Sequence, residues 1–326
     1  MSQNSQYVLA EEMVNAIHGV LGFHPNYRAL HAQGNLYRGT FRATPEAKQY
    51  TRAVHLQGDP VPATVRFSIG GGDPNAPPKQ TVGMATKFYL PDGRVTDLVM
   101  LNAPSFFIRT PEELIPLAAA LTPVPGTGQP DPAKLKAFVA THPASGAALE
   151  VRHKMQSPVS FSKTNFYGIH AFRFVNAEGV GRYAKYQWMP DDGVAGQTVE
   201  ELQKHPNDYL FREMASRVQR GPVKFALTLE FAEPGDPLDD PTQIWPAGRK
   251  QVVIGHVEVI AQTSIEEIGD PVMLHDPTRV TDGIELSDDP VVQVRRGVYE
   301  VSAAQRTGGW HSCPFGQIAD KFGPKP

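Results

Sequence analysis

Apolar residues recur at two spacings along the chain, and each spacing predicts a different element. Between residues 7 and 21 they stand three or four positions apart until Gly22, which predicts a helix. Residues 64–69 alternate instead and predict a strand with one apolar and one polar face. The apolar face carries Val65, Phe67 and Ile69, and the polar face carries Arg66 and Ser68.

Further strand patterns come in pairs around turn residues, which is typical of antiparallel sheets. The expected pairs are 86–90 with 95–101 and 170–175 with 182–188, and further strands are expected at 223–231 and 251–260. Helices are expected to begin near Pro111 and Asp131 and at a capping box at 198–201, the last running toward Arg220. This order predicts one domain, mostly antiparallel sheet with helices added.

Composition narrows the class of protein. The 29 glycines and 30 prolines among 326 residues disfavour an all-helical bundle. A net charge of −3 offers no excess of positive charge for a nucleic acid, so no nucleic-acid partner is expected. The single cysteine, Cys313, excludes an internal disulfide and every cysteine-cluster metal site.

Membrane and export signals are also missing from the sequence. No apolar run approaches the roughly 20 residues of a membrane helix, and the first residues lack a signal-peptide pattern. We therefore expect a cytoplasmic protein with no membrane partner, or a periplasmic one if a signal peptide has been removed. The common nucleotide-binding, hydrolase-elbow and zinc-protease motifs are absent, and the eleven histidines are scattered.

A series of segments nevertheless resembles the haem catalases, in that family's order. The segments are 28–34 (Arg-Ala-Leu-His-Ala-Gln-Gly), 65–68, 83–89, 97–109, 165–172, 175–179 and 283–299. The likeness runs from about residue 8 to 310, and in length the chain is similar to the small catalase-related peroxidases. The resemblance implies an α+β fold, a catalase-type eight-stranded antiparallel β-barrel with surrounding helices that enclose haem b. It also implies a single minimal domain over residues 1–326, without the long N-terminal arm or the C-terminal helical domain of full-size catalases.

The resemblance further implies roles for individual residues. Tyr299 would be the axial iron ligand, and Arg295, one helical turn earlier, would stabilise its phenolate. His31 would be the distal acid–base group, since an imidazole can take and return a proton near neutral pH. Ser68 would orient that imidazole, and Arg28, Arg66 and Arg306 would pair with the haem propionates. Taken alone, each could also be an ordinary core tyrosine, structural histidine, strand serine or surface arginine.

Two positions depart from the family pattern. In catalases two asparagines precede Thr-Pro, and the first reaches the distal pocket. This chain has Leu101 and Asn102 there, so either Asn102 turns into the pocket and serves catalysis, or the distal asparagine is missing. Leu114 stands where the family places an aromatic ring over the haem.

The function implied is that of a haem peroxidase acting against oxidative stress. It would reduce hydrogen peroxide or organic hydroperoxides with an organic electron donor and show weak catalase activity, in a homo-oligomer such as a dimer. One alternative is a true catalase or a hydroperoxide-rearranging enzyme like the allene oxide synthases. Leu30 weighs against rearrangement, because coral allene oxide synthase has a threonine there. Another alternative is a non-enzymatic haem-binding protein.

Overall fold

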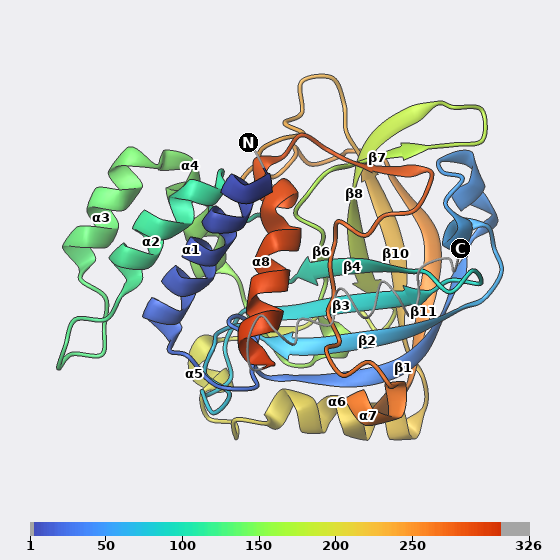
Figure 1. The fold of residues 1–326 in the computed structure, drawn as a ribbon. Helices are drawn as coiled ribbons and strands as arrows, with labels where there is room; N and C mark the ends of the chain where they lie inside the picture. The colour runs from blue at the N-terminus through green and yellow to red at the C-terminus, as the bar shows by residue number, and fades with distance from the viewer. Residues whose placement is uncertain (1–2, 308–326) are drawn as a thin grey trace.

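A closed antiparallel barrel forms the centre of the computed structural model, which describes residues 3–307 (Figure 1). Its eight strands are β1 (Gly34–Ala43), β2 (Val61–Ile69), β3 (Val82–Tyr89), β4 (Val95–Leu101), β6 (Phe166–Tyr167), β8 (Gly181–Pro190), β10 (Val223–Phe231) and β11 (Gln251–Thr263). Strand β10 pairs with β11 on one side and with β8 on the other, which closes the sheet. The predicted eight-stranded antiparallel barrel is confirmed.

Four short strands lie outside the barrel. β7 (Phe172–Val175) pairs with the start of β8, β12 (Ile284–Leu286) pairs with β7, and β5 (Ser157–Pro158) pairs with β9 (Gly196–Gln197). Because β12 pairs with β7, the segment that leads into the last helix lies beside residues 172–174 from the middle of the sequence.

The barrel interior is filled by apolar side chains. The largest fully buried side chains on the barrel strands include Tyr37, Phe41, Phe67, Phe88, Phe166, Phe225 and Trp188. The alternation predicted for β2 is confirmed, because Val65, Phe67 and Ile69 belong to this core. Arg66 and Ser68 line a cavity on the other side of the strand. Because side chains fill its interior, the barrel forms a packed wall on one side of this cavity.

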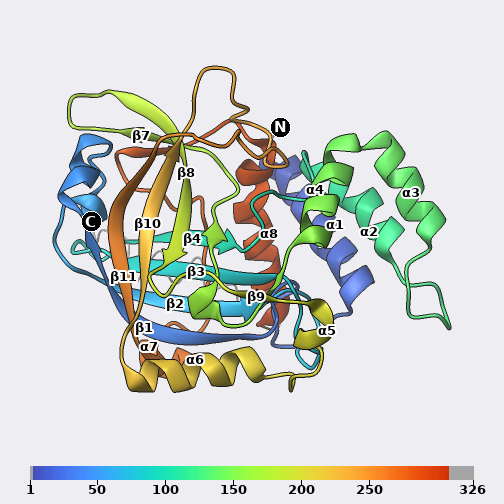
Figure 2. The same ribbon diagram turned by 180° about the vertical axis from the view of Figure 1, so that it is seen from behind.

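Two groups of helices lie around the barrel (Figures 1 and 2). Beside the ends of β2, β3 and β4 are α1 (Gln3–Leu21), α2 (Leu114–Leu121), α3 (Pro132–Thr141), α4 (Pro143–Lys154) and α8 (Pro290–Arg306), and at another side are α5 (Val199–Leu202), α6 (Tyr209–Arg220) and α7 (Ile265–Ile268). Short 3₁₀ helices occupy Pro45–Gln49, Val54–Leu56, Pro111–Glu113 and Phe161–Lys163. Figures 1 and 2 show α8 beside the ends of β2, β3 and β4, with α1 packed on its other side. The space between barrel and helices holds the candidate site.

The helical stretch expected from 198 to Arg220 is interrupted. Thr198 and Glu201 form the predicted capping box, but α5 ends at Leu202. Pro206 lies in the gap before α6 and cannot donate the backbone hydrogen bond that a continuous helix needs. Within residues 3–307, no helix is long and apolar enough to cross a membrane. Cys313 lies outside the described residues.

Candidate active site

A cavity of about 550 Å³ lies between the barrel wall and the helices. Strands β2, β3 and β4 supply one side, and α1 and α8 supply another. The loop before β1, the loop at 274–275, the segment after β4 and one residue each from α2 and α4 also line it. Most of the surface is apolar, and the polar groups are concentrated in a few side chains. This combination is typical of a site that encloses a largely apolar cofactor or ligand.

His31 lies in the loop before β1 and faces Ser68 of β2. Its Nδ1 is 3.0 Å from the Ser68 Oγ. A Cβ on Gly83 of β3 would lie 3.0 Å from that Oγ and 3.1 Å from the imidazole, so the glycine makes room for the pair. The predicted orientation of His31 by Ser68 therefore agrees with the observed contact, although the role of the pair stays a prediction.

The backbone at His31 is held in an uncommon conformation. Its φ of 55° is left-handed, a state that costs a non-glycine residue roughly 1–3 kcal/mol. The Arg66 guanidinium donates to the His31 carbonyl at 2.9 Å and to the Ala32 carbonyl at 3.3 Å, and so fixes the turn. A Cβ on Gly34 would come within 2.3 Å of this guanidinium, so position 34 must lack a side chain for Arg66 to reach.

The surroundings of His31 favour its neutral form. Burial lowers the pKa of His31 to about 3, and the positive charges of Arg66 and Arg152 act in the same direction. An uncharged imidazole can accept a proton at once. His31 is therefore suited to act first as a base.

Tyr299 and Arg295 lie one turn apart on α8, as predicted. The helix begins at Pro290, and the N-cap residue before it, Asp289, accepts a hydrogen bond from the Val291 amide. Arg295 donates to the Tyr299 hydroxyl oxygen, and its guanidinium carbon is 5.3 Å from the centre of the tyrosine ring. The tyrosine oxygen thus lies against a fixed positive charge.

The Arg295–Tyr299 contact is extended by two residues, His170 and Asp289, for which the sequence predicted no role. Nη1 of Arg295 is 2.9 Å from Nε2 of His170, and Nδ1 of His170 is 2.6 Å from the Asp289 carboxylate. Burial lowers the pKa of His170, while the Asp289 carboxylate opposes this shift. Both residues stand in the segments that resemble catalases, and this was the signal available for finding them.

The three arginines predicted to bind propionates come together from distant parts of the chain. Arg28 donates to the Met273 carbonyl, and Arg306 donates to the Val272 carbonyl at 2.6 Å. Burial and the positive charge of Arg306 together lower the pKa of Arg66 to about 9. The buried Nε of Arg306 has no hydrogen-bond partner among the described residues. Such a group of cations fits a ligand that carries carboxylates.

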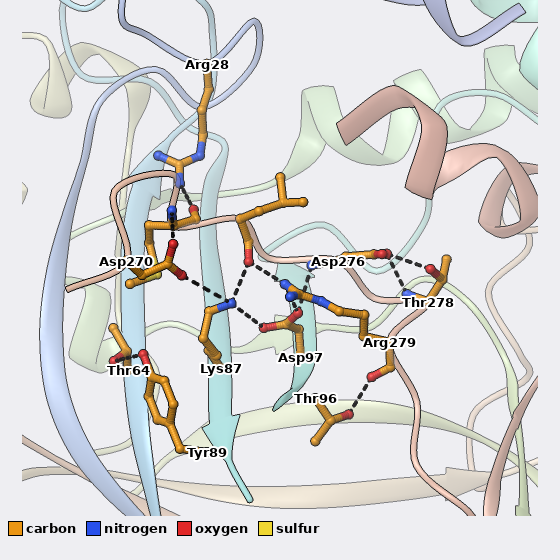
Figure 3. Close-up of polar contacts among 12 residues, drawn as sticks. Arg28, Thr64, Lys87, Tyr89, Thr96, Asp97, Asp270, Asp276, Thr278 and Arg279 are labelled. Atoms are coloured by element: carbon orange, nitrogen blue, oxygen red, sulfur yellow. Dashed lines mark hydrogen bonds and ion pairs between the residues drawn. The ribbon is translucent and has the colours of Figure 1, made fainter. Parts of the chain in front are cut away.

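A buried polar network fixes the loop against which these arginines pack (Figure 3). Lys87 of β3 donates to the Leu274 carbonyl at 2.7 Å and lies 3.6 Å from the carboxylate of Asp97 on β4. Asp97 also pairs with Arg279 at 2.5 Å and accepts from the Asp276 amide at 3.0 Å. Burial raises the pKa of Asp97, and the neighbouring cations oppose the shift. The network thereby ties the 274–279 loop to the barrel wall.

Asn102 does not turn into the cavity. Its amide oxygen accepts from the Val82 amide at 2.9 Å, and its amide nitrogen donates to the Gln80 carbonyl at 2.9 Å. Both ends of the side chain are thus used to join β4 to the start of β3, and Leu101 lines the cavity instead. Of the two alternatives for the distal asparagine, the geometry agrees with the one in which it is missing. Leu114 also lines the cavity, in keeping with the predicted loss of an aromatic ring.

Comparison with known proteins identifies the family of this arrangement. The family model described as "Catalase" matches residues 25–315. A protein of Synechococcus elongatus named "Catalase-related peroxidase" is 36% identical over 304 residues, which are 93% of this chain and 90% of the relative. A protein of the same name from Mycolicibacterium paratuberculosis is 39% identical over 303 residues, 91% of this chain and 95% of the relative.

A solved structure shows the same fold at greater distance. A fungal catalase superposes with a TM-score of 0.77 at 22% identity, over 86% of this chain and 60% of the catalase. The chain thus spans less than two thirds of that structure, but nearly all of the two catalase-related peroxidases. The predicted resemblance is confirmed, and haem is the cofactor that the family generally uses. The chain belongs to the catalase family.

Proposed function

We propose that the protein is a haem-dependent peroxidase that reduces hydrogen peroxide or organic hydroperoxides with an organic electron donor and has weak catalase activity. Its family and its catalase-related peroxidase relatives make it an oxidoreductase that acts on peroxide. The observation that carries the finer proposal is one cavity with the His31–Ser68 pair on the barrel side and the Arg295–Tyr299 pair on α8.

The residues of the cavity fit haem b and its iron. Arg28, Arg66 and Arg306 would hold the two propionates, and the unpartnered Nε of Arg306 supports this assignment. Tyr299 would bind the iron through its phenolate oxygen, which the Arg295 guanidinium stabilises. When bound, the haem iron supplies the redox chemistry of O–O bond cleavage.

His31 would move the proton. Its Nδ1 is engaged by Ser68, which leaves Nε2 to exchange a proton with the hydroperoxide. As a neutral base it takes the proton from the inner oxygen, and as an acid it returns the proton to the outer oxygen. The outer oxygen then leaves as water or as an alcohol, and two electrons and two protons from the organic donor release the inner oxygen as water.

The weakness of catalase activity follows from the distal wall. Disproportionation needs a second hydrogen peroxide to be held beside His31 by another hydrogen-bonding side chain. Leu101 lines the cavity and offers none, while the Asn102 amide is already bonded to backbone at both ends. The geometry therefore favours reduction by an external donor over oxidation of a second peroxide.

Turnover of hydrogen peroxide and of cumene hydroperoxide, each with and without guaiacol as donor, tests the proposal. We expect guaiacol oxidation to dominate and oxygen evolution to be slow, and we expect Leu101→Asn to raise oxygen evolution. Oxygen evolution with a kcat/KM near the diffusional ceiling of ~10⁸ M⁻¹s⁻¹, or no donor oxidation, would contradict it. A haem absorbance spectrum unchanged by either peroxide would point to a non-enzymatic haem protein.

A further inference from the structure

The cavity carries more positive charge than the predicted cofactor explains. Among the described residues that line it, six are cationic and none is an aspartate or glutamate. The cationic residues are Arg28, Arg66, Lys79, Arg152, Arg295 and Arg306. Arg295 is bonded to Tyr299 and His170, and three others form the group assigned to the propionates. Arg152 and Lys79 remain without an assigned anion.

Arg152 is the more informative of the two because its side chain is only partly exposed, whereas that of Lys79 is exposed. It comes from α4, and its guanidinium carbon lies 5.2 Å from the centre of the Phe107 ring. Its buried Nε and Nη2 have no hydrogen-bond partner among residues 3–307. Burial lowers the pKa of Arg152 to about 10, so it stays charged at neutral pH. A buried charged donor without an acceptor is costly, and a bound anion would supply the missing acceptor.

Arg152 lines the cavity beside Phe107, which follows β4. Its positive charge is one of those that lower the pKa of His31, together with Arg66, Arg295 and Arg28. Two of the propionate arginines differ in position, since Arg28 and Arg306 donate to the loop at 272–273. Lys79 adds a second cation at the cavity lining, and its side chain is exposed there. An anion at Arg152 would therefore lie in the same cavity as His31.

The rest of this region is apolar. Leu21 and Leu30 line it from the N-terminal segment, Phe106 and Phe107 follow β4, and Leu114 opens α2. Leu30 is 38% exposed, which places it where the cavity meets solvent. A ligand that satisfies both features has an apolar body and one anionic group.

We propose that Arg152 binds the carboxylate of the substrate, and that the preferred substrates are hydroperoxides of long-chain carboxylic acids. This inference rests on the proposed peroxidase function. A guanidinium can bind a carboxylate through two parallel hydrogen bonds, and these are strong in an apolar setting. The apolar body would occupy the leucine- and phenylalanine-lined region while the hydroperoxide group reaches His31. Hydrogen bonds of charged groups support an effect of about 10- to 100-fold on KM.

The test compares two substrates that differ only in the carboxylate. These are the 13-hydroperoxide of linoleic acid and its methyl ester, turned over by the haem-loaded protein with guaiacol. We expect the wild-type KM for the acid to be at least tenfold below that for the ester. Arg152→Gln should raise the acid's KM about 10- to 100-fold and leave the ester's KM unchanged, and Arg152→Lys should restore part of the difference.

Arg220→Gln is the matched control, because it removes one positive charge from an exposed position on α6. It should change neither KM. Equal KM values for acid and ester in the wild type would overturn the inference, and so would a rise of both values in Arg152→Gln. The second result would assign Arg152 a structural role against Phe107.

Two further measurements separate this inference from the proposed function. Cumene hydroperoxide carries no carboxylate, so its turnover by wild type and Arg152→Gln tests peroxidase activity alone. Calorimetric binding of linoleic acid, which has no O–O bond, tests Arg152 without any turnover. We expect at least tenfold weaker binding in Arg152→Gln and Arg152→Lys to fall between. Unchanged binding would contradict the inference even if no hydroperoxide is consumed.

Discussion

The two sides of the cavity are built by different means. On α8, Tyr299 ends a chain of hydrogen bonds through Arg295 and His170 to the buried carboxylate of Asp289. On the barrel side, His31 has one side-chain partner, Ser68, and depends on Arg66 to hold its backbone. The hydrogen bonds on α8 end at Asp289, the N-cap residue of that helix. On the barrel side the imidazole belongs to a residue, His31, whose backbone is left-handed.

The difference indicates what each side must do. A phenolate that binds a metal has to keep its charge and its position. The chain of hydrogen bonds supplies a cation, Arg295, which His170 and the Asp289 carboxylate hold in place. A histidine that transfers a proton to and from a substrate needs one ring nitrogen that is not hydrogen-bonded to another protein group. The Asn102 amide is bonded to backbone, so among the described residues on this side His31 is the group proposed to move a proton.

The largest effect is expected on the α8 side, from Tyr299→Phe. Only the phenolate oxygen offers an anionic ligand at this position, so the purified variant should fold but hold little haem. The haem-to-protein ratio and the visible spectrum measure this. Tyr27→Phe, at a tyrosine that is 46% exposed, is the control and should match wild type. A Tyr299→Phe spectrum and haem content equal to wild type would remove Tyr299 from the site.

On the barrel side, His31→Ala should leave haem binding intact and slow the reaction with hydroperoxide. Acid–base assistance by one side chain is typically worth ~10²–10⁴-fold. Stopped-flow absorbance on mixing with hydrogen peroxide gives the rate. Ser68→Ala should cause a smaller loss, because it frees the imidazole without removing it. A wild-type rate in His31→Ala would show that this histidine is structural.

His170→Gln tests the hydrogen bonds behind Arg295, because it removes the imidazole that contacts Arg295 and leaves Tyr299, the proposed iron ligand, unchanged. Arg295 would lose one of its two side-chain partners, and we expect haem to be lost about 10- to 100-fold faster. Transfer of haem to apomyoglobin measures the rate. The control is His256→Gln on the exposed surface of β11. Haem loss at the wild-type rate would mean that these hydrogen bonds do not stabilise the ligand.

The smallest expected effect concerns pH. Burial and the charge of Arg66 lower the pKa of His31 from 6.5 to about 3. A histidine with a lowered pKa is already the neutral base at every pH above that value. The rate constant with hydrogen peroxide should therefore stay level between about pH 5 and 8. A rate that falls with decreasing pH around a midpoint near 6.5 would show that His31 titrates as an ordinary imidazole.

Much of the barrel could be predicted from the sequence because its strands have one face in an apolar core. The alternation in β2 placed Arg66 and Ser68 on the cavity side, and the spacing of Arg295 and Tyr299 placed both on one face of α8. Strand β1 was not predicted. Its two glycines interrupt the apolar pattern, and one of them makes room for Arg66.

The contacts that join distant segments could not be predicted from local patterns. Asp289 and His170 are 119 positions apart, and only the pairing of β12 with β7 brings their segments together. The amide of Asn102 could have pointed either way until its partners at Val82 and Gln80 were known. Arg152 gave no signal at all, because its significance depends on the partners it lacks.

A crystal structure of the haem-loaded protein would test the central claim most directly. The account predicts haem in the cavity between β2 and α8, with the Tyr299 oxygen on the iron and His31 on the opposite face. It also predicts the propionates at Arg28, Arg66 and Arg306. Iron bound by any other side chain, or haem bound outside this cavity, would contradict the account.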